Sequence, residues 1–465
     1  MIAARGFGGG TPEVTIVLGL AYGDEGKGTV VDHLSRERRA ALVVRYNGGA
    51  QAAHNVVTSG GRHHTFAQLG SGTLAGAETL LSRFMLVNPF TLEAEARSLS
   101  EPLARVMIDA RALVTTPWHI AMNRLREMAR SGRHGSCGMG IGETTSAWLA
   151  RPAAALRIGD LASPAIVKEK IATLRSALLS ELASFEDLLP DSLVAQRELS
   201  ILEDEETIGF AAERYERFAK NVRIVGTEAL ADALGRGRHV IFEGAQGVLL
   251  DQDFGFQPHT TWTDITFANA FTLLDEVGFE GKATRLGVLR AYGTRHGAGP
   301  FVTEDGGFDR LSEHDHNRWG EWQHGLRSGA LDEVALRYAL DVVGGIDALA
   351  VTNLDRLALL GDRVPVAVAY ESSLHERIEA LPVSRPFSLE AQERLTHTLF
   401  GCRPILERRV CAGTRGALAY AERIALTAGA PLAIASFGPT SDDKLTFGNR
   451  TARKPRIEED SPELP

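Results

Sequence analysis

The residues VTIVLGLAYGDEGKGTVVDHL (14–34) predict a strand, a glycine-rich loop and a helix in direct succession. VTIVLGL (14–20) is an apolar run, typical of a strand buried on both faces of a sheet. TVVDHLSRERR (29–39) has the pattern of an amphipathic helix. Backbone N–H groups in such a loop can converge on an anion at the helix N-terminus, so the stretch predicts a phosphate site.

The loop departs from the common phosphate loop, G-x-x-x-x-G-K-[ST]. Ala21 and Gly28 stand where that pattern has a glycine and a Ser or Thr. Lys27 offers a mobile positive charge, whereas Asp24 and Glu25 place negative charge where a phosphate would bind. These acids make sense if Asp24 binds Mg²⁺ or takes a proton from a substrate. The alternative is a tight turn whose charges are only solvated.

Further near-continuous apolar runs alternate with helical patterns along the chain, at 41–46, 239–245, 285–293, 346–354 and 431–438. Such runs suit parallel strands that are covered on both faces. We therefore predict an α/β fold with a large, mainly parallel central sheet, flanking helices and a P-loop-like phosphate loop. Ligands bind sheets of this type beyond the carboxyl ends of the strands.

The 465 residues have the composition of an ordinary soluble globular protein, 44% hydrophobic and 23% charged. Residues 163–235 carry apolar residues at helical spacing, which indicates a mainly helical insertion. We expect one elaborated domain over 12–450, with flexible segments at 1–11 and 451–465.

Net charge, hydropathy and cysteine content limit the classes of binding partner and indicate the redox compartment. A net charge of −9 argues against non-specific nucleic-acid binding. No stretch reaches the roughly 18 to 20 apolar residues that a membrane span needs, so no membrane partner is expected. Three cysteines are too few for a disulfide scaffold and fit a reducing cytoplasm.

Six segments resemble the signature segments of the adenylosuccinate synthetase family, in that family's order. They are GDEGKG (23–28), VVRYNGGAQAAHNVV (43–57), FEGAQGVLLDQDFG (242–255), AYGTRHGAGPFVTE (291–304), VTNLDRL (351–357) and SFGPT (436–440). The resemblance implies a large α/β fold that forms homodimers. It also implies a ligase that joins IMP and L-aspartate, using GTP and Mg²⁺.

The resemblance assigns catalytic roles to three residues. Asp24 would be the general base at N1 of the purine and a ligand of one Mg²⁺ per subunit, which the Ala53 carbonyl would also bind. His54 would be the general acid beside the transferred phosphoryl group, and Lys27 would neutralise its charge. The alternative for His54 is a capped or core histidine.

The resemblance also implies a pocket for the IMP phosphate. Cys137, in place of a threonine, Gln246 and Thr261 would line it, and Arg151 would reach in from a second subunit. Gln51 replaces a substrate-binding asparagine. The alternative for Arg151 is a surface salt bridge.

In the family, guanine is recognised by T-K-x-D, which here is TNLD (352–355). Asp355 keeps the carboxylate that accepts from guanine, while Asn353 replaces the lysine, so GTP is favoured over ATP. The resemblance implies further nucleotide contacts at Gly23, Glu25, Gly26, Gly28, Thr29, Arg327, Ser436 and Gly438.

The largest departure lies in the loop that binds the amino acid, which in the family reads T-T-G-R-R-R-R. Here it is WGEWQHGLR (319–327), where His324 and Leu326 stand in place of two clamp arginines and Arg327 is kept. Each charge-assisted hydrogen bond is worth roughly 1.5–3 kcal/mol, so aspartate binding would need substitutes. Candidate substitutes nearby are Arg295, His296, His314 and Arg318.

Three functions remain open on this sequence. The first is the family reaction, supported by the intact phosphoryl-transfer residues. The second is a paralogue that activates an oxygen with GTP but joins a different amine in a rebuilt acceptor pocket, in which His324 contacts the substrate. The third is a GTP-binding regulator without turnover, although such a protein needs neither Asp24 nor His54.

Overall fold

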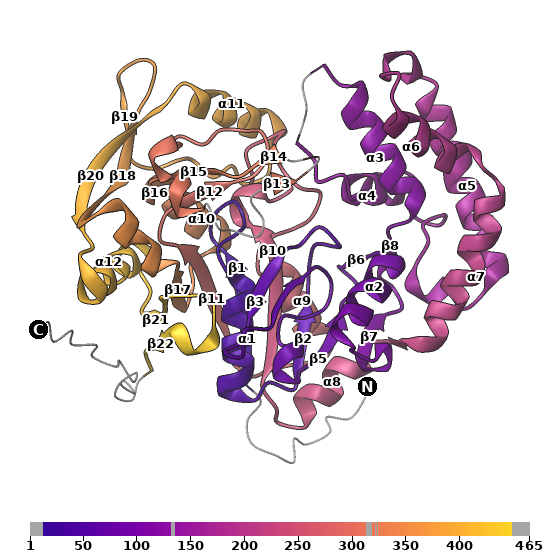
Figure 1. Cartoon of the computed structure of the whole chain (residues 1–465), viewed down its shortest axis with the longest axis horizontal. Coiled ribbons are helices and arrows are strands. Elements are labelled where there is room, and N and C mark those ends of the chain that lie inside the picture. The colour runs from indigo at the N-terminus through magenta and orange to yellow at the C-terminus, as the bar shows by residue number, and fades with distance from the viewer. Residues whose placement is uncertain (1–12, 132–134, 313–318, 321, 323, 449–465) are drawn as a thin grey trace, which may run out of the picture.

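The fold is built on a ten-stranded central sheet, drawn through the middle of the molecule in Figure 1. The computed structural model describes residues 13–131, 135–312, 319–320, 322 and 324–448. Every neighbouring pair in this sheet is parallel except β21 with β22, at one edge. This arrangement confirms the predicted α/β fold. In spatial order the strands are β22 (Lys444–Thr446), β21 (Leu432–Ser436), β17 (Ala348–Thr352), β11 (Ala283–Arg290), β1 (Val14–Gly19), β10 (Val240–Gly247), β2 (Leu42–Arg45), β5 (Glu78–Leu81), β7 (Val106–Asp109) and β9 (Arg223–Val225).

Alternate residues of β1 pack against helices on opposite faces of the sheet. Ile16 and Leu18 join the largest apolar cluster, which includes α8, α9, α10 and α12, whereas Val17 packs with Val30 and Val31 of α1. All six residues of β1 are buried, as the apolar run predicts. These helices are α1 (Lys27–Arg38), α8 (Glu228–Gly235), α9 (Ala268–Glu276), α10 (Glu333–Val343) and α12 (Gly413–Ala428).

A separate group of helices surrounds a second apolar cluster, at the right of Figure 1. The segment predicted as a helical insertion supplies α5, α6 and α7, and it then returns to the sheet through β9, which pairs with β7. A strand of three residues is too short to show a pattern in the sequence. The helices of this group are α2 (Pro89–Leu99), α3 (Pro117–Ala129), α5 (Pro164–Leu182), α6 (Leu193–Glu203) and α7 (Glu206–Asn221). Helix α4 (Ile141–Ala150) packs on α3, and its Ile141 belongs to a smaller apolar cluster.

Smaller sheets surround the central one. A four-stranded sheet stands beside α11 (Leu389–Phe400) in the gold region of Figure 1, with β16 (Leu331–Asp332), β18 (Arg363–Glu371), β19 (Arg377–Ile378) and β20 (Arg403–Val410). The remaining strands pair in twos: β3 (His54–Val57) with β4 (His63–Phe66), β6 (Leu86–Val87) with β8 (Leu113–Val114), β12 (Gly293–Arg295) with β15 (Arg327–Gly329), and β13 (Trp319–Gly320) with β14 (His324–Gly325).

The parallel strands of the central sheet end at one common edge. The glycine-rich loop follows β1, and the segments after β10, β11, β17 and β21 leave the sheet at the same edge. This edge is where open α/β sheets bind ligands. Among the described residues, no helix has the length and apolar character that a bilayer crossing requires.

The packing of β1 can be tested with Ile16→Ala, which removes a side chain with no solvent exposure. We expect the free energy of unfolding to fall by about 2–5 kcal/mol, because a cavity remains in the core. Urea unfolding followed by circular dichroism measures it. Leu426→Ala, at a side chain that is 73% exposed, is the control and should change the value by less than about 0.5 kcal/mol.

Candidate functional site

A cavity of about 320 Å³ opens at the carboxyl edge of the sheet, beside the glycine-rich loop. Its wall combines seven segments of the chain, and five of them follow strands β1, β10, β11, β17 and β21, whose ends converge here. The predicted site residues that line it are Gly23, Asp24, Gly26, Lys27, Gly28, Thr29, Gln51, Ala53, His54, Gln246, Asn353, Asp355, Ser436 and Gly438.

The two acids of the loop have different surroundings. Asp24 faces the cavity, whereas the Glu25 carboxylate is fully buried and accepts hydrogen bonds from the Ala21 and Gly23 N–H groups, at 3.0 and 2.9 Å. Lys27 Nζ lies 2.5 Å from the same carboxylate and is 2% exposed. The expectation of a mobile Lys27 is therefore wrong, because a buried partner holds the ammonium group.

Unusual backbone geometry gathers at this cavity. Asp24, Gln246 and Asn353 are non-glycine residues with a φ of +58° each, and all three line the cavity wall. Left-handed backbone at such residues costs of the order of 1–3 kcal/mol and clusters at functional sites in proteins. The strain therefore supports a ligand-binding role for this cavity.

His54 is held by a buried carboxylate that the sequence analysis did not single out. His54 Nδ1 donates to Glu243 Oε1 at 2.6 Å, and Glu243 also accepts from the Ser71 N–H at 2.9 Å. The hydrogen bond at Nδ1 leaves Nε2 as the ring nitrogen for a ligand. Glu243 was detectable in principle, since an acid interrupts the apolar run HVIFEGA of β10.

Burial and charge oppose each other in this pair. Burial lowers the pKa of His54 below its usual value, and the hydrogen bond to Glu243 offsets only part of this effect. Burial alone would raise the pKa of Glu243, but the charge of Arg45 and the hydrogen bonds from His54 and Ser71 lower it to about 2. Glu243 is therefore a carboxylate at neutral pH and fixes the orientation of the imidazole.

Other cavity residues were not expected. Arg290, at the end of β11, and Arg356 both line the wall, and Arg356 Nε lies 3.4 Å from Asp355 Oδ2. Arg290 was visible only as a cation that ends the apolar part of a buried strand.

The loop that replaces the arginine clamp leaves Leu326 in the cavity wall. Arg327 is not among the lining residues: it binds Glu304 at 2.8 Å and the Gly297 and Gly299 carbonyl groups. The side chain of His324 and all of His314 and Arg318 lie outside the described residues.

Of the four candidate substitutes, the structure excludes Arg295. Its guanidinium group is 1% exposed, donates to the Ala298 and Pro300 carbonyl groups at 2.8 and 3.0 Å, and lies 4.3 Å from the centre of the Tyr22 ring. Arg295 therefore drops out as a candidate, since carbonyl groups already occupy its donors. His296, the next residue, does line the cavity.

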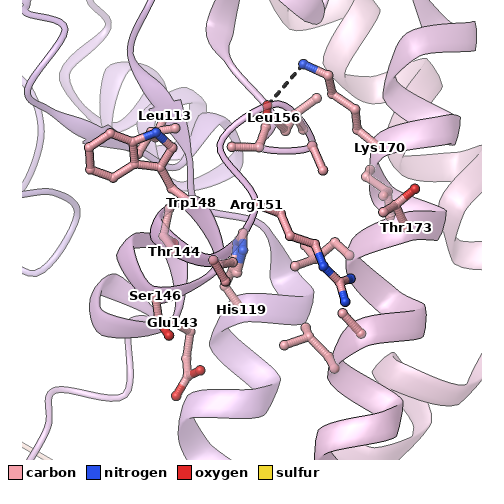
Figure 2. Close-up of a pocket in the computed structure, with 18 of the residues that line it drawn as sticks. Leu113, His119, Glu143, Thr144, Ser146, Trp148, Arg151, Leu156, Lys170 and Thr173 are labelled. Atoms are coloured by element: carbon pink, nitrogen blue, oxygen red, sulfur yellow. Dashed lines mark hydrogen bonds between the residues drawn. The ribbon is translucent and has the colours of Figure 1, made fainter.

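Four other predicted residues lie away from this cavity wall: Glu25, Cys137, Arg151 and Thr261. Burial raises the pKa of the Cys137 thiol to about 11, so the thiol stays protonated. Arg151 follows α4 and lines a separate cavity of about 340 Å³. Figure 2 shows its side chain extended toward α5, the helix that carries Lys170 and Thr173.

Comparison with known proteins identifies the family. The family model described as adenylosuccinate synthetase matches residues 16–445. The chain belongs to the adenylosuccinate synthetase family. The adenylosuccinate synthetase of Synechococcus sp. (strain RCC307) is 32% identical over 461 residues, which cover 92% of this chain and 95% of that protein. That of Thermoplasma acidophilum is 34% identical over 368 residues, 76% of this chain and 78% of that protein.

Solved structures of two proteins share the fold of this adenylosuccinate synthetase family member. The fully ligated adenylosuccinate synthetase of Plasmodium falciparum aligns with a TM-score of 0.76 and 23% identity, over 94% of this chain and 100% of that chain. The succinoaminodeoxyadenylate synthetase (PurZ) of cyanophage S-2L, bound to dGMP and dATP as an energy donor, aligns with a TM-score of 0.52 and 16% identity, over 94% and 95%.

The contact between His54 and Glu243 predicts the effect of Glu243→Gln. Glu243 opposes the effect of burial on His54, so removal of its charge should lower the pKa of the imidazole further. Histidine NMR titration of the folded protein measures this pKa. Glu379→Gln, at an exposed side chain, should leave the His54 signal unchanged, and a higher pKa in Glu243→Gln would contradict the assigned pair.

Proposed function

We propose that this family member joins IMP and L-aspartate to form adenylosuccinate, with conversion of GTP to GDP and phosphate. The observation that carries the proposal is that Asp24, Lys27 and His54 line one cavity at the start of α1. A base, a cation and an imidazole around one cavity suit the activation of a purine oxygen by phosphoryl transfer.

In the first proposed step, the Asp24 carboxylate takes the proton from N1 of the purine. The freed electron pair makes the 6-oxygen nucleophilic, and that oxygen attacks the γ-phosphorus of GTP. The bond between the γ-phosphorus and the bridging oxygen breaks, and GDP leaves. Loop N–H groups at the start of α1 and the ammonium group of Lys27 stabilise the charge on the phosphoryl oxygens.

His54 acts in the same step from its Nε2 atom. The Glu243 carboxylate binds Nδ1–H and opposes part of the lowering of the His54 pKa by burial. The negative charge of a bound phosphoryl group would add to this effect and favour the protonated imidazole that a general acid requires. Protonated Nε2 then donates to a phosphoryl oxygen. Glu243 is thus a positioning residue for His54.

In the second proposed step, the amino group of aspartate attacks C6 of the purine. The bond between C6 and the phosphorylated oxygen breaks, and inorganic phosphate leaves with the electron pair. The new C–N bond is complete when the nitrogen loses its proton. Gln51 and Gln246, which both line the cavity, are placed to bind the purine nucleotide during this exchange.

The donor atoms in the cavity fit Mg²⁺, which takes oxygen ligands and retains water and substrate phosphates. We propose that the Asp24 carboxylate and the Ala53 carbonyl hold one Mg²⁺ per subunit together with the nucleotide. When bound, the ion offsets the negative charge of the phosphates. The described residues contain no cluster of three His, Cys, Asp or Glu, so the nucleotide must complete the site.

The base of GTP is assigned to the segments after β17 and β21. Asp355 would accept from guanine N–H groups, and Asn353, Ser436 and Gly438 line the wall beside it. Arg356, 3.4 Å from Asp355, balances the carboxylate charge before the nucleotide binds.

A second candidate function has its own support at the acceptor side. Leu326 lines the cavity in place of a clamp arginine, and Arg327 is engaged with Glu304. A neutral wall favours an amine that is less anionic than aspartate. The same activation by GTP would then serve a different acceptor.

One assay separates these functions. The protein is incubated with GTP, Mg²⁺ and IMP, with and without L-aspartate, and phosphate release and the purine ultraviolet spectrum are followed. Aspartate-dependent product supports the family reaction, and product with another amine alone supports the second function. If the protein binds GTP but shows no turnover with any amine, the result supports a GTP-binding regulator.

Asp24→Asn tests the proposed base. Asparagine tolerates the left-handed backbone at this position but cannot take a proton, so turnover should fall by at least about 10². Nucleotide binding, measured by calorimetry, should remain detectable. Asp187→Asn, at an exposed residue beyond α5, is the control and should keep full turnover. Full turnover in Asp24→Asn would refute the assignment.

We also propose a cytoplasmic homodimer in which Arg151 reaches the partner's site. Its exposed position outside its own chain's cavity supports this arrangement. Arg151→Leu and Asp24→Asn should each be inactive alone. A mixed dimer would carry one intact site, so random mixing should restore about a quarter of the turnover. A tagged pull-down confirms that the subunits have exchanged. If turnover does not recover after exchange, Arg151 does not contribute to the partner's site.

A further inference from the structure

His296 lies beside the proposed base, and its two buried ring nitrogens have no hydrogen-bond partner among the described residues. It directly follows β12, lines the cavity, and its side chain is 10% exposed. His296 Nε2 lies 3.4 Å from Asp24 Oδ2, and neither ring nitrogen makes a hydrogen bond within the described part of the chain. A buried ring nitrogen without a hydrogen bond is unfavourable, so a ligand group that supplies one would stabilise His296.

The surrounding contacts hold His296 in place relative to Asp24. Arg295 binds the carbonyl groups of the segment that follows His296 and packs over the ring of Tyr22, two residues before Asp24. The Tyr22 hydroxyl donates to the Pro300 carbonyl at 3.2 Å. The glycine-rich loop and the segment after β12 are thus joined by a cation–π contact and a hydrogen bond. A site on two such fastened segments is pre-organised for one ligand.

The position of His296 relative to the purine follows from the proposed function, on which this inference rests. Asp24 takes the proton from N1, whose ring neighbours are C2 and C6. The oxygen on C6 must face the γ-phosphoryl group, which Lys27 and His54 stabilise. A group next to Asp24 that takes no part in phosphoryl transfer is therefore available to a substituent on C2.

We propose that His296 is a specificity-determining residue that binds the exocyclic amino group of a 2-amino-6-oxopurine 5′-nucleotide. An imidazole nitrogen accepts a hydrogen bond from an amino group on C2, while Asp24 accepts from N1–H of the same base. Hypoxanthine has only a C–H group at C2 and gives His296 nothing to bind. The site thereby admits guanine mononucleotides in addition to IMP.

The test is equilibrium binding of GMP and IMP by calorimetry, so it does not depend on turnover. A non-hydrolysable GTP analogue and Mg²⁺ first saturate the triphosphate site, which prevents GMP from binding there. His296→Leu should weaken GMP binding about tenfold and change IMP binding less than about twofold. His296→Asn keeps an acceptor oxygen and should retain most of the affinity for GMP.

Several outcomes would overturn the proposal. They are a wild-type protein that does not bind GMP, an equal loss of both nucleotides in His296→Leu, and no loss of either. His375→Leu, at a side chain that is 85% exposed, is the matched control and should bind both nucleotides normally. Failure of the proposed function has a different signature: wild-type protein that binds IMP yet forms no adenylosuccinate.

Discussion

The buried pair of Glu25 and Lys27 is the interaction on which the site depends. One Glu25 oxygen accepts from two loop N–H groups, the other binds Lys27, and the Thr352 hydroxyl donates to the Glu25 carbonyl. Glycines at 19 and 247 leave room for the carboxylate, because a Cβ at either position would collide with it. This pair explains why a phosphate loop contains two acids. Glu25 fixes the shape of the loop, and Asp24 faces the cavity.

The sheet explains how distant segments meet around that loop. Parallel strands release their following residues at one edge, so the segments after β1, β10, β11, β17 and β21 share a single cavity wall. Each strand supplies a different chemical group to this wall. Buried β-branched residues hold the strands in register, and polar residues begin where the strands end.

The sequence predicted the parallel sheet and the phosphate loop because both depend on local patterns, such as the apolar run of β1. Most of the cavity wall followed from family resemblance, including His54 and Gln246. What the sequence could not show were contacts between distant residues. Glu243 reaches His54 across 189 positions, and Arg295 is consumed by carbonyl groups that only the folded chain brings to it. The same limit applies to Lys27, because only the folded loop brings its ammonium group to the buried Glu25 carboxylate.

Strand β9 affects which length changes the segment with α5, α6 and α7 can tolerate during evolution. The strand ties the far end of the segment that contains α5, α6 and α7 to the edge of the central sheet through β7. Insertions or deletions between those helices leave both anchor points in place. Loss of the strand itself would move the edge of the sheet from the three residues of β9 to the four residues of β7, at which another chain could add. Length variation between related chains should therefore concentrate in the loops that join α5, α6 and α7.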